Sequence, residues 1–214
     1  MSRQHGETTT MKTLYIFLTR SGTLLSNLVY SLTGAQYTHI SLAFDEDLST
    51  LYSSTRKNGY TMFPAGPSRE YLNRGVFLMR ENIPCALYAL EVTDEAYTRA
   101  KRRTQHMMHH GELYRFNSLG LLLCWMHIRW QRRRHYFCSQ FVSEVLQKSG
   151  ALELPKPSTL MHPSDYAELH CLYRGTLAGL PQRQSMELGE VESVMGLYLN
   201  VLLGAVKGRV RRLF

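Results

Sequence analysis

The chain has 214 residues, of which 44% are hydrophobic and 11% aromatic, and its 25 Lys and Arg against 17 Asp and Glu give a formal net charge of +8. This composition supplies one buried core and excludes a chain that is disordered throughout. Seven Pro and 15 Gly without a period exclude collagen-like and low-complexity chains, and no repeated unit indicates a solenoid. The positive charge implies an anionic partner or surface.

The beginning of the chain predicts a cytoplasmic protein. Residues 1–10 are polar, and the apolar stretch 14–18 is too short for the hydrophobic region of a signal peptide. No run reaches the roughly 18 apolar residues of a transmembrane helix. The cysteines form no Cys-x-x-Cys pair, so their spacing predicts neither a disulfide framework nor a zinc site. They are Cys85, Cys124, Cys138 and Cys171.

Apolar spacing predicts mostly strands in the first half of the chain. The expected strands are residues 13–18, 39–44, 51–54, 75–79 and 85–92. The second and third flank an acidic turn and form a hairpin, and residues 23–32 have the spacing of a helix. Residues 58–73 hold Gly and Pro with few periodic apolar positions, so we expect a long loop that overhangs a site.

The second half of the chain is mainly helical. The expected helices are residues 93–110, 118–130 and 138–148. The first begins with the capping sequence Thr93-Asp94-Glu95, the second is almost wholly apolar, and the third ends at Gly150. A proline-rich linker, a strand over 172–177 and a helical segment from about residue 191 follow.

Cys138 has the setting of a catalytic nucleophile, because a helix N-terminus stabilises a thiolate through its unpaired amides and its dipole. A thiolate nucleophile also needs a base and a third group that orients the base. His39 opens a predicted strand and is the candidate base. Ser53 on the hairpin partner is the candidate orienting group, with Ser54 on the opposite face. Taken alone, such a cysteine is more often a small core residue and such a histidine a structural one.

Two segments together resemble a known family. The first is similar to the histidine strand of the circularly permuted NlpC-like cysteine hydrolases and reads Tyr37-Thr38-His39-Ile40-Ser41-Leu42-Ala43-Phe44. The second is similar to their nucleophile helix and reads Tyr136-Phe137-Cys138-Ser139-Gln140-Phe141-Val142. Pro163-Ser164-Asp165 resembles the turn that follows this helix. The similarity covers about residues 13–170 and points to the papain-like superfamily, in the branch that includes lecithin:retinol acyltransferase-like enzymes.

The resemblance implies an α+β, permuted papain-like fold, in which a small antiparallel sheet packs on the nucleophile helix. It divides the chain into a flexible N-terminus (1–12), a thiol hydrolase domain (13–180) and an apolar-basic helical tail (181–214). Cys138 then acts as the nucleophile, and His39 acts as the general base that later protonates the leaving group.

The third catalytic position departs from the family pattern. Many relatives carry Glu, His, Asn or Gln on the strand after the histidine, whereas this chain has Ser53 in that neighbourhood. A serine hydroxyl cannot stabilise an imidazolium as a carboxylate does. Tyr114 is a candidate for a hydroxyl on the oxyanion side, although a partly buried structural tyrosine explains it better.

Two groups of histidine and cysteine have the spacing of metal ligands. His106, His109 and His110 lie one helical turn apart, as do Cys124 and His127. A solvated basic helix end explains the first group better, and packing in an apolar helix explains the second. We therefore expect neither a metal nor a cofactor.

Three short clusters hold 12 of the 25 basic residues. They are residues 99–103, Arg129–Arg134 and Lys207–Arg212. The last two directly follow apolar stretches, an arrangement that suits a helix at an anionic phospholipid surface. For 119–134 the alternative is a packed core helix with solvated arginines at its end. The C-terminal segment has the alternative of docking on the domain or on a second copy. Nucleic acid is the less favoured partner, because no recognisable binding motif interleaves aromatic and basic residues.

The sequence thus predicts a cysteine-dependent hydrolase or acyltransferase that cleaves an amide or ester bond through an acyl-enzyme at Cys138. The apolar-basic segments favour a lipid or membrane-proximal substrate and a peripheral place on the inner face of the membrane. Two alternatives stay open. One is a catalytically weak or inactive membrane-surface or interaction protein of the same fold, and the other is a cytoplasmic peptidase or amidase acting on a small peptide.

Overall fold

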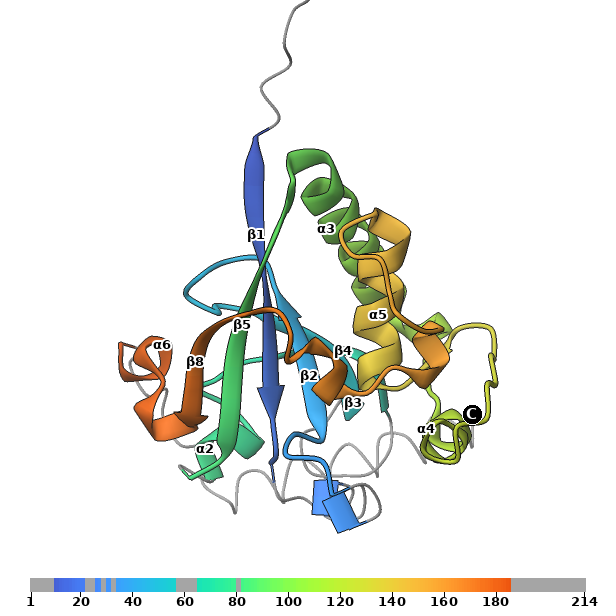
Figure 1. Ribbon diagram of the computed structural model, residues 1–214, viewed down its shortest axis with the longest axis horizontal. Helices are drawn as coiled ribbons and strands as arrows, with labels where there is room; N and C mark the ends of the chain where they lie inside the picture. The colour runs from blue at the N-terminus through green and yellow to red at the C-terminus, as the bar shows by residue number, and fades with distance from the viewer. Residues whose placement is uncertain are drawn as a thin grey trace, which may run out of the picture.

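A six-stranded antiparallel sheet lies at the centre of the computed structural model (Figure 1). The structure describes residues 10–185 except 22–25, 28–29, 32–33, 57–64 and 80–81. The strands are β1 (Met11–Thr19), β2 (His39–Ala43), β3 (Leu51–Arg56), β4 (Ala65–Glu70), β5 (Pro84–Thr93) and β8 (His170–Thr176). Their order across the sheet is β4-β3-β2-β1-β5-β8, and every pair is antiparallel. The predicted α+β class with an antiparallel sheet is therefore confirmed.

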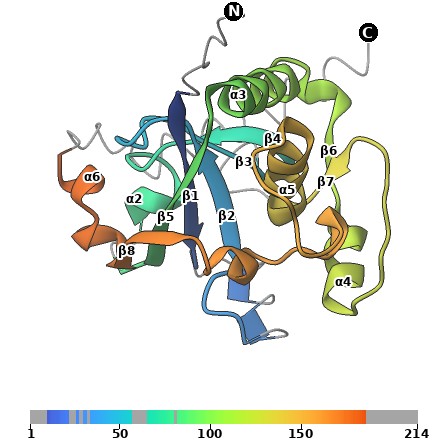
Figure 2. The same ribbon diagram turned by 45° about the horizontal axis from the view of Figure 1, so that its top comes forward.

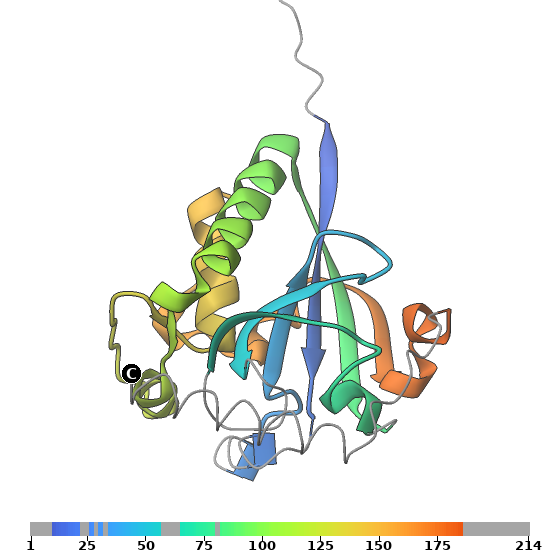
Figure 3. The ribbon, with the colours of Figure 1, turned by 180° about the vertical axis from the view of Figure 1, so that it is seen from behind.

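Two helices, α3 (Asp94–His109) and α5 (Cys138–Ser149), lie side by side on one face of this sheet (Figure 2). The remaining helices and 3-10 turns are α2 (Val76–Met79), η1 (Gly111–Leu113), α4 (Ser118–Trp125), η2 (Ser158–Leu160), η3 (Pro163–Tyr166), η4 (Leu177–Gly179) and α6 (Pro181–Gln184). A small parallel ladder joins β6 (Arg115–Phe116) to β7 (His135–Tyr136). Seen from behind, β3 and β4 curve toward α3 and α5 (Figure 3).

Alternation along the strands builds a core on both faces of the sheet. On β1, Leu14, Ile16 and Leu18 are buried in the cluster formed with α3 and α5, whereas Phe17 is buried in the second cluster. The α5 residues in the first cluster are Cys138, Phe141, Val142, Val145 and Leu146. The second cluster is closed by Phe77 of α2, Leu177 of η4 and Leu180. Because both faces are covered, the sheet is a rigid base for residues at its ends.

The two helices on the sheet begin and end as their sequences predict. The side chain of Thr93 accepts a hydrogen bond from the amide of Ala96 at the start of α3. Gly150 ends α5 with a φ of 73°, a left-handed conformation that glycine adopts without strain. Arg103 of α3 pairs with Glu144 of α5 at 3.0 Å, and this ion pair fixes the two helices together.

Two predicted elements were wrong. The expected loop 58–73 contains β4, whose sequence has few strand-forming residues; Pro67 is tolerated there because β4 lies at an edge of the sheet. The expected strand 75–79 is instead the short helix α2, entered through Gly75 at a φ of 60°. A short apolar run does not distinguish a strand from a helical turn, and a left-handed glycine sets the turn here.

Most of the other predicted strands and helices are confirmed where the structure describes them. The strands expected over 13–18, 39–44, 51–54, 85–92 and 172–177 and the helices over 93–110 and 138–148 are confirmed within a few residues. The helix expected over 118–130 ends earlier, at Trp125, and His127 adopts a φ of 56°. Most of the expected helix 23–32, residues 1–9 of the expected flexible N-terminus 1–12 and the segment from residue 191 lie outside the described residues. The last two residues of that N-terminus, 11 and 12, instead belong to β1. Within the described part, no helix combines the length and hydropathy needed to cross a membrane.

Candidate active site

Cys138 is the first residue of α5, directly after an extended residue. Phe137 has φ −90° and ψ 172°, and its side chain makes no capping hydrogen bond. The first helical bond of α5 runs from the amide of Phe141 to the carbonyl of Phe137. The backbone amides of Cys138 and Ser139 precede that bond, so they belong to the helix N-terminus, where partial positive charge favours an anion.

His39 opens β2 and lies between a carboxylate and a thiol. Its Nε2 is 2.9 Å and 3.1 Å from the two carboxylate oxygens of Glu70, the last residue of β4. The thiol of Cys138 forms a hydrogen bond with the same imidazole ring, and this bond raises the pKa of the histidine. Since Nε2 is occupied by Glu70, the nitrogen left for the thiol is Nδ1. Cysteine, histidine and glutamate thus form a chain in which the histidine contacts the thiol on one side and the carboxylate on the other.

The carboxylate decides the charge of the histidine. Burial of the ring lowers the pKa of His39, but the charge of Glu70 and hydrogen bonds to Cys138 and Glu70 outweigh burial and raise the pKa to about 10. At neutral pH the ring is therefore an imidazolium. A cation beside a cysteine is the condition under which the thiolate forms most easily. The side chains of His39 and Glu70 are 16% and 15% exposed, so their interaction is only weakly screened by water.

Ser41 holds the carboxylate in place. Its hydroxyl donates to Glu70 Oε2 at 2.6 Å and lies 3.3 Å from His39 Nε2. His39 and Ser41 are two residues apart on β2 and therefore point to the same face of the strand. Ser41 belongs to the histidine motif, but the sequence alone predicted no role for it.

The predicted orienting residue was wrong. The hydroxyl of Ser53 donates to the backbone carbonyl of Ile40 at 2.7 Å, and His39 is held by Glu70 instead. Ser54 donates to the carbonyl of Tyr136 at 2.6 Å and so ties β3 to the strand that leads into Cys138. Strand alternation placed both serines near the histidine but did not foresee that β4 brings a carboxylate to it.

A buried amide pair supports the first turn of α5. The side-chain amide of Asn117 donates to Gln140 Oε1 at 3.2 Å, and its oxygen accepts from the amide of Gly120 at the start of α4. Ser139 donates to the carbonyl of Met161 at 2.6 Å. Both residues that follow Cys138 are fixed by hydrogen bonds, which holds the nucleophile rigidly.

Tyr114 lies against the core beside this turn. Its ring is 6.1 Å from the ring of Tyr136, and it packs on the cluster that includes Cys138. This environment fits the structural interpretation, and its role on the oxyanion side stays a prediction. The histidine rings at the end of α3 contact one another, and the ring centres of His106 and His110 are 4.6 Å apart. Among the described residues, no group of three or more histidine, cysteine or acidic side chains has the arrangement of a metal site.

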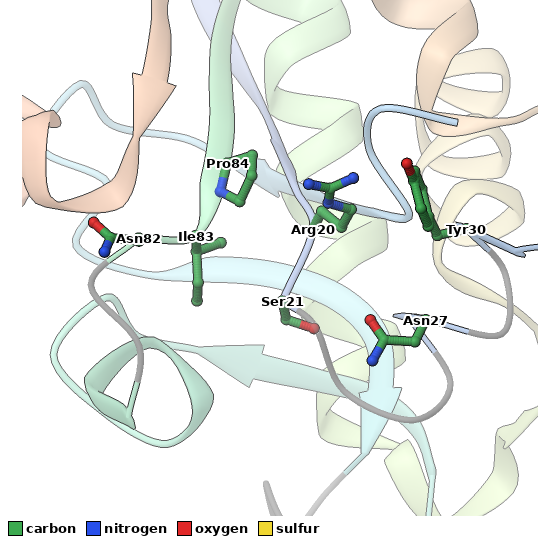
Figure 4. Close-up of a pocket in the computed structure, with 7 residues that line it drawn as sticks. All are labelled: Arg20, Ser21, Asn27, Tyr30, Asn82, Ile83 and Pro84. Carbon is green, nitrogen blue, oxygen red and sulfur yellow. The ribbon is translucent and has the colours of Figure 1, made fainter. Parts of the chain in front are cut away.

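A polar cavity of about 380 Å³ is lined by residues that directly follow β1 and precede or open β5 (Figure 4). Thr19 pairs with His39 across β1 and β2, and the next residue, Arg20, lines the cavity. Its guanidinium lies 4.6 Å from the ring centre of Tyr30, and Ser21, Asn27 and Asn82 add polar groups. A cationic, polar cavity of this kind is suited to an anionic or polar group.

Comparison with known proteins adds no assignment to this geometry. No family model, no curated protein and no solved structure matches the chain.

Proposed function

We propose that the protein is a cysteine-dependent hydrolase or acyltransferase that cleaves an amide or ester bond through an acyl-enzyme on Cys138. One observation carries the proposal. The cysteine begins a helix beside a histidine whose Nε2 contacts both oxygens of the part-buried Glu70 carboxylate. These are the three parts that nucleophilic thiol catalysis needs, namely a nucleophile, its acid-base partner and a group that orients the partner.

The reaction follows from these positions. The thiolate of Cys138 attacks the carbonyl carbon of the substrate, and a carbon–sulfur bond forms. The negative charge on the carbonyl oxygen is stabilised by amides at the start of α5. The imidazolium of His39 donates its proton to the leaving amine or alcohol as the carbon–nitrogen or carbon–oxygen bond breaks. Water or an acceptor alcohol or amine then loses a proton to His39, attacks the thioester and frees the thiol.

The order of the elements supports a permuted papain-like fold. The histidine strand precedes the nucleophile helix by 99 positions, and the sheet packs on that helix. Glu70 is one of the residue types that relatives carry at the third position. The proposal of a weak or inactive protein rested on a serine there, and the carboxylate removes that reason. A small peptide and a lipid stay open as substrates.

Site-resolved alkylation tests the proposal. We expect iodoacetamide to modify Cys138 rapidly at a pH where ordinary thiols are protonated, and much more slowly in a His39→Ala variant. Cys171 is an exposed free cysteine of the same chain and serves as the internal control for reagent and pH. Mass spectrometry of peptides gives both rates in one sample. If Cys138 followed the pH dependence of Cys171, or if His39→Ala left its rate unchanged, thiol catalysis would be excluded.

A further inference from the structure

Exposed apolar side chains concentrate in one part of the molecule. Among the described residues, nine large hydrophobic side chains are exposed, and six of them fall between residues 113 and 128. Five of these form what we call the α4 patch, and they are 39% to 52% exposed. The α4 patch consists of Leu119, Leu122, Trp125, Met126 and Ile128. A group of this kind on a soluble domain marks an interaction surface.

Helical spacing places three side chains of the α4 patch on the same side of the helix. Leu119, Leu122 and Met126 are three and four residues apart and therefore lie on one side of α4. The opposite side carries Gly120 and Cys124, which are buried against the domain. The alternative of a packed core helix therefore describes the inner side of α4 but not its exposed outer side.

An arginine-rich loop follows the α4 patch directly. The arginine loop comprises residues 129–134, and the side chains of Arg129, Arg132, Arg133 and Arg134 are all exposed. None of these guanidinium groups pairs with a carboxylate within the described part of the chain. Four like charges side by side repel one another, and an anionic surface removes that repulsion.

The loop has a defined shape that presents these charges. Arg132 and Arg134 accept backbone hydrogen bonds from His135 and Arg115, and the carbonyl of Arg133 bonds to the His135 ring. The β6–β7 ladder closes the excursion at its base. The α4 patch and the arginine loop therefore form one protruding unit held by fixed backbone contacts.

We propose that this unit docks the protein on an anionic phospholipid bilayer. The α4 patch enters the boundary between headgroups and acyl chains, and the arginines bind lipid phosphates. Nucleic acid would satisfy the arginines but would leave the α4 patch in water. A second copy meeting the same surface in a twofold contact would cover the apolar side chains but bring four more arginines against these four. A bilayer satisfies both the α4 patch and the arginine loop, because its acyl chains are apolar and its headgroups are anionic.

Docking also brings the nucleophile to the membrane. Figures 1 and 2 show α4 at the end of the molecule where α5 begins. Asn117, which caps α4, is hydrogen bonded to Gln140, two residues after Cys138. This consequence rests on the proposed function, whereas docking itself does not.

Vesicle flotation with the full-length protein tests the docking. The vesicles are phosphatidylcholine alone or an equal mixture of phosphatidylcholine and phosphatidylglycerol. We expect binding to the anionic mixture only, with a loss of roughly 30-fold in Arg132→Gln/Arg133→Gln, because each basic residue at an anionic surface contributes about 1 kcal/mol. Leu122→Ser/Met126→Ser loses roughly tenfold or more, because it removes apolar area that enters the bilayer. Cys138→Ala binds as the wild type does, which separates docking from catalysis.

Matched variants on other surfaces serve as controls. Leu172 on β8 is 45% exposed against 46% for Leu122, and Lys101 and Arg102 form an exposed basic pair on α3. Leu172→Ser and Lys101→Gln/Arg102→Gln are expected to bind as the wild type does. Equal losses in the controls would show a non-specific charge or solubility effect and overturn the proposal. Failure of the wild-type protein to bind anionic vesicles would overturn it as well. So would a wild-type protein that binds no vesicles but forms a concentration-dependent dimer that Leu122→Ser/Met126→Ser abolishes.

Tryptophan fluorescence provides an independent readout that does not depend on the fold of the patch variants. The Trp130→Phe variant leaves Trp125 as the one tryptophan of the chain. Its emission should shift to the blue with anionic vesicles and be quenched by brominated acyl chains. Emission that stays unshifted and unquenched while the protein is bound would exclude insertion of the α4 patch.

Discussion

The imidazole of His39 receives opposite influences from burial and from its neighbours. Burial disfavours the charged ring, and Glu70 favours it; the carboxylate prevails because it contacts Nε2 with both oxygens. Replacing Glu70 by a neutral amide therefore changes the charge of the ring while keeping its shape and much of its hydrogen bonding. This makes the glutamate a positioning residue whose effect is measurable apart from the chemistry at Cys138.

Stability against pH reports this effect directly. The pKa of His39 is raised above its unfolded value of 6.5 to about 10, so its contribution is fully present below pH 6.5 and is lost as the pH rises through 10. A Cys138→Ala background removes thiol titration and also the part of the raised pKa that comes from Cys138, whereas the charge of Glu70 still raises the pKa of His39. In this background we expect the free energy of unfolding to fall by up to roughly 1 kcal/mol per pH unit as the pH rises above 6.5. Adding Glu70→Gln should flatten that slope.

Urea denaturation at several pH values measures both slopes. Glu153→Gln in the same background is the control, because Glu153 is an exposed carboxylate far along the chain from the histidine. A slope that Glu70→Gln and Glu153→Gln change equally would contradict a raised pKa caused by Glu70.

Asn117 links the two helices that matter for the site. It caps α4 and contacts Gln140, a fully buried residue in the first turn of α5. We expect Asn117→Ala to lower the free energy of unfolding by about 2 kcal/mol, since it removes a helix cap and leaves a buried amide without its partner. Thermal or urea denaturation measures the change. Ser118→Ala, at the exposed neighbouring position, should cost much less, and equal losses would show that the cap contributes little.

The sequence predicts a site residue when the residues that determine its position lie close to it along the chain. Cys138 and His39 were found because each lies in a short motif at the start of a regular element. Glu70 was missed because it is 31 residues from the histidine and ends a strand that lacks a strand-like sequence. Its position depends on the pairing of Leu51 with Glu70 at the edge of the sheet, which the spacing of apolar residues does not predict. The exposure of α4 was equally hidden, because hydrophobicity alone does not say which side of an apolar helix packs.

The basic residues behind the net charge of +8 lie in separate parts of the chain. The arginine loop directly follows α4, while Arg20 lines the cavity just beyond the end of β1 that pairs with His39. The cluster Lys207–Arg212 lies outside the described residues. The proposed docking surface and the cavity therefore use different basic residues.

Activity on two forms of one ester tests whether docking and catalysis act together. The Leu122→Ser/Met126→Ser variant leaves Cys138, His39 and Glu70 in place, so kcat/KM for a short-chain, water-soluble ester should stay near the wild-type value. For a long-chain ester carried in anionic vesicles, kcat/KM should fall roughly in proportion to the loss of vesicle binding, about tenfold. Leu172→Ser again provides the control. A fall of the same size on both esters would mean that the α4 patch supports the active site itself, because docking affects only the substrate that resides in the membrane.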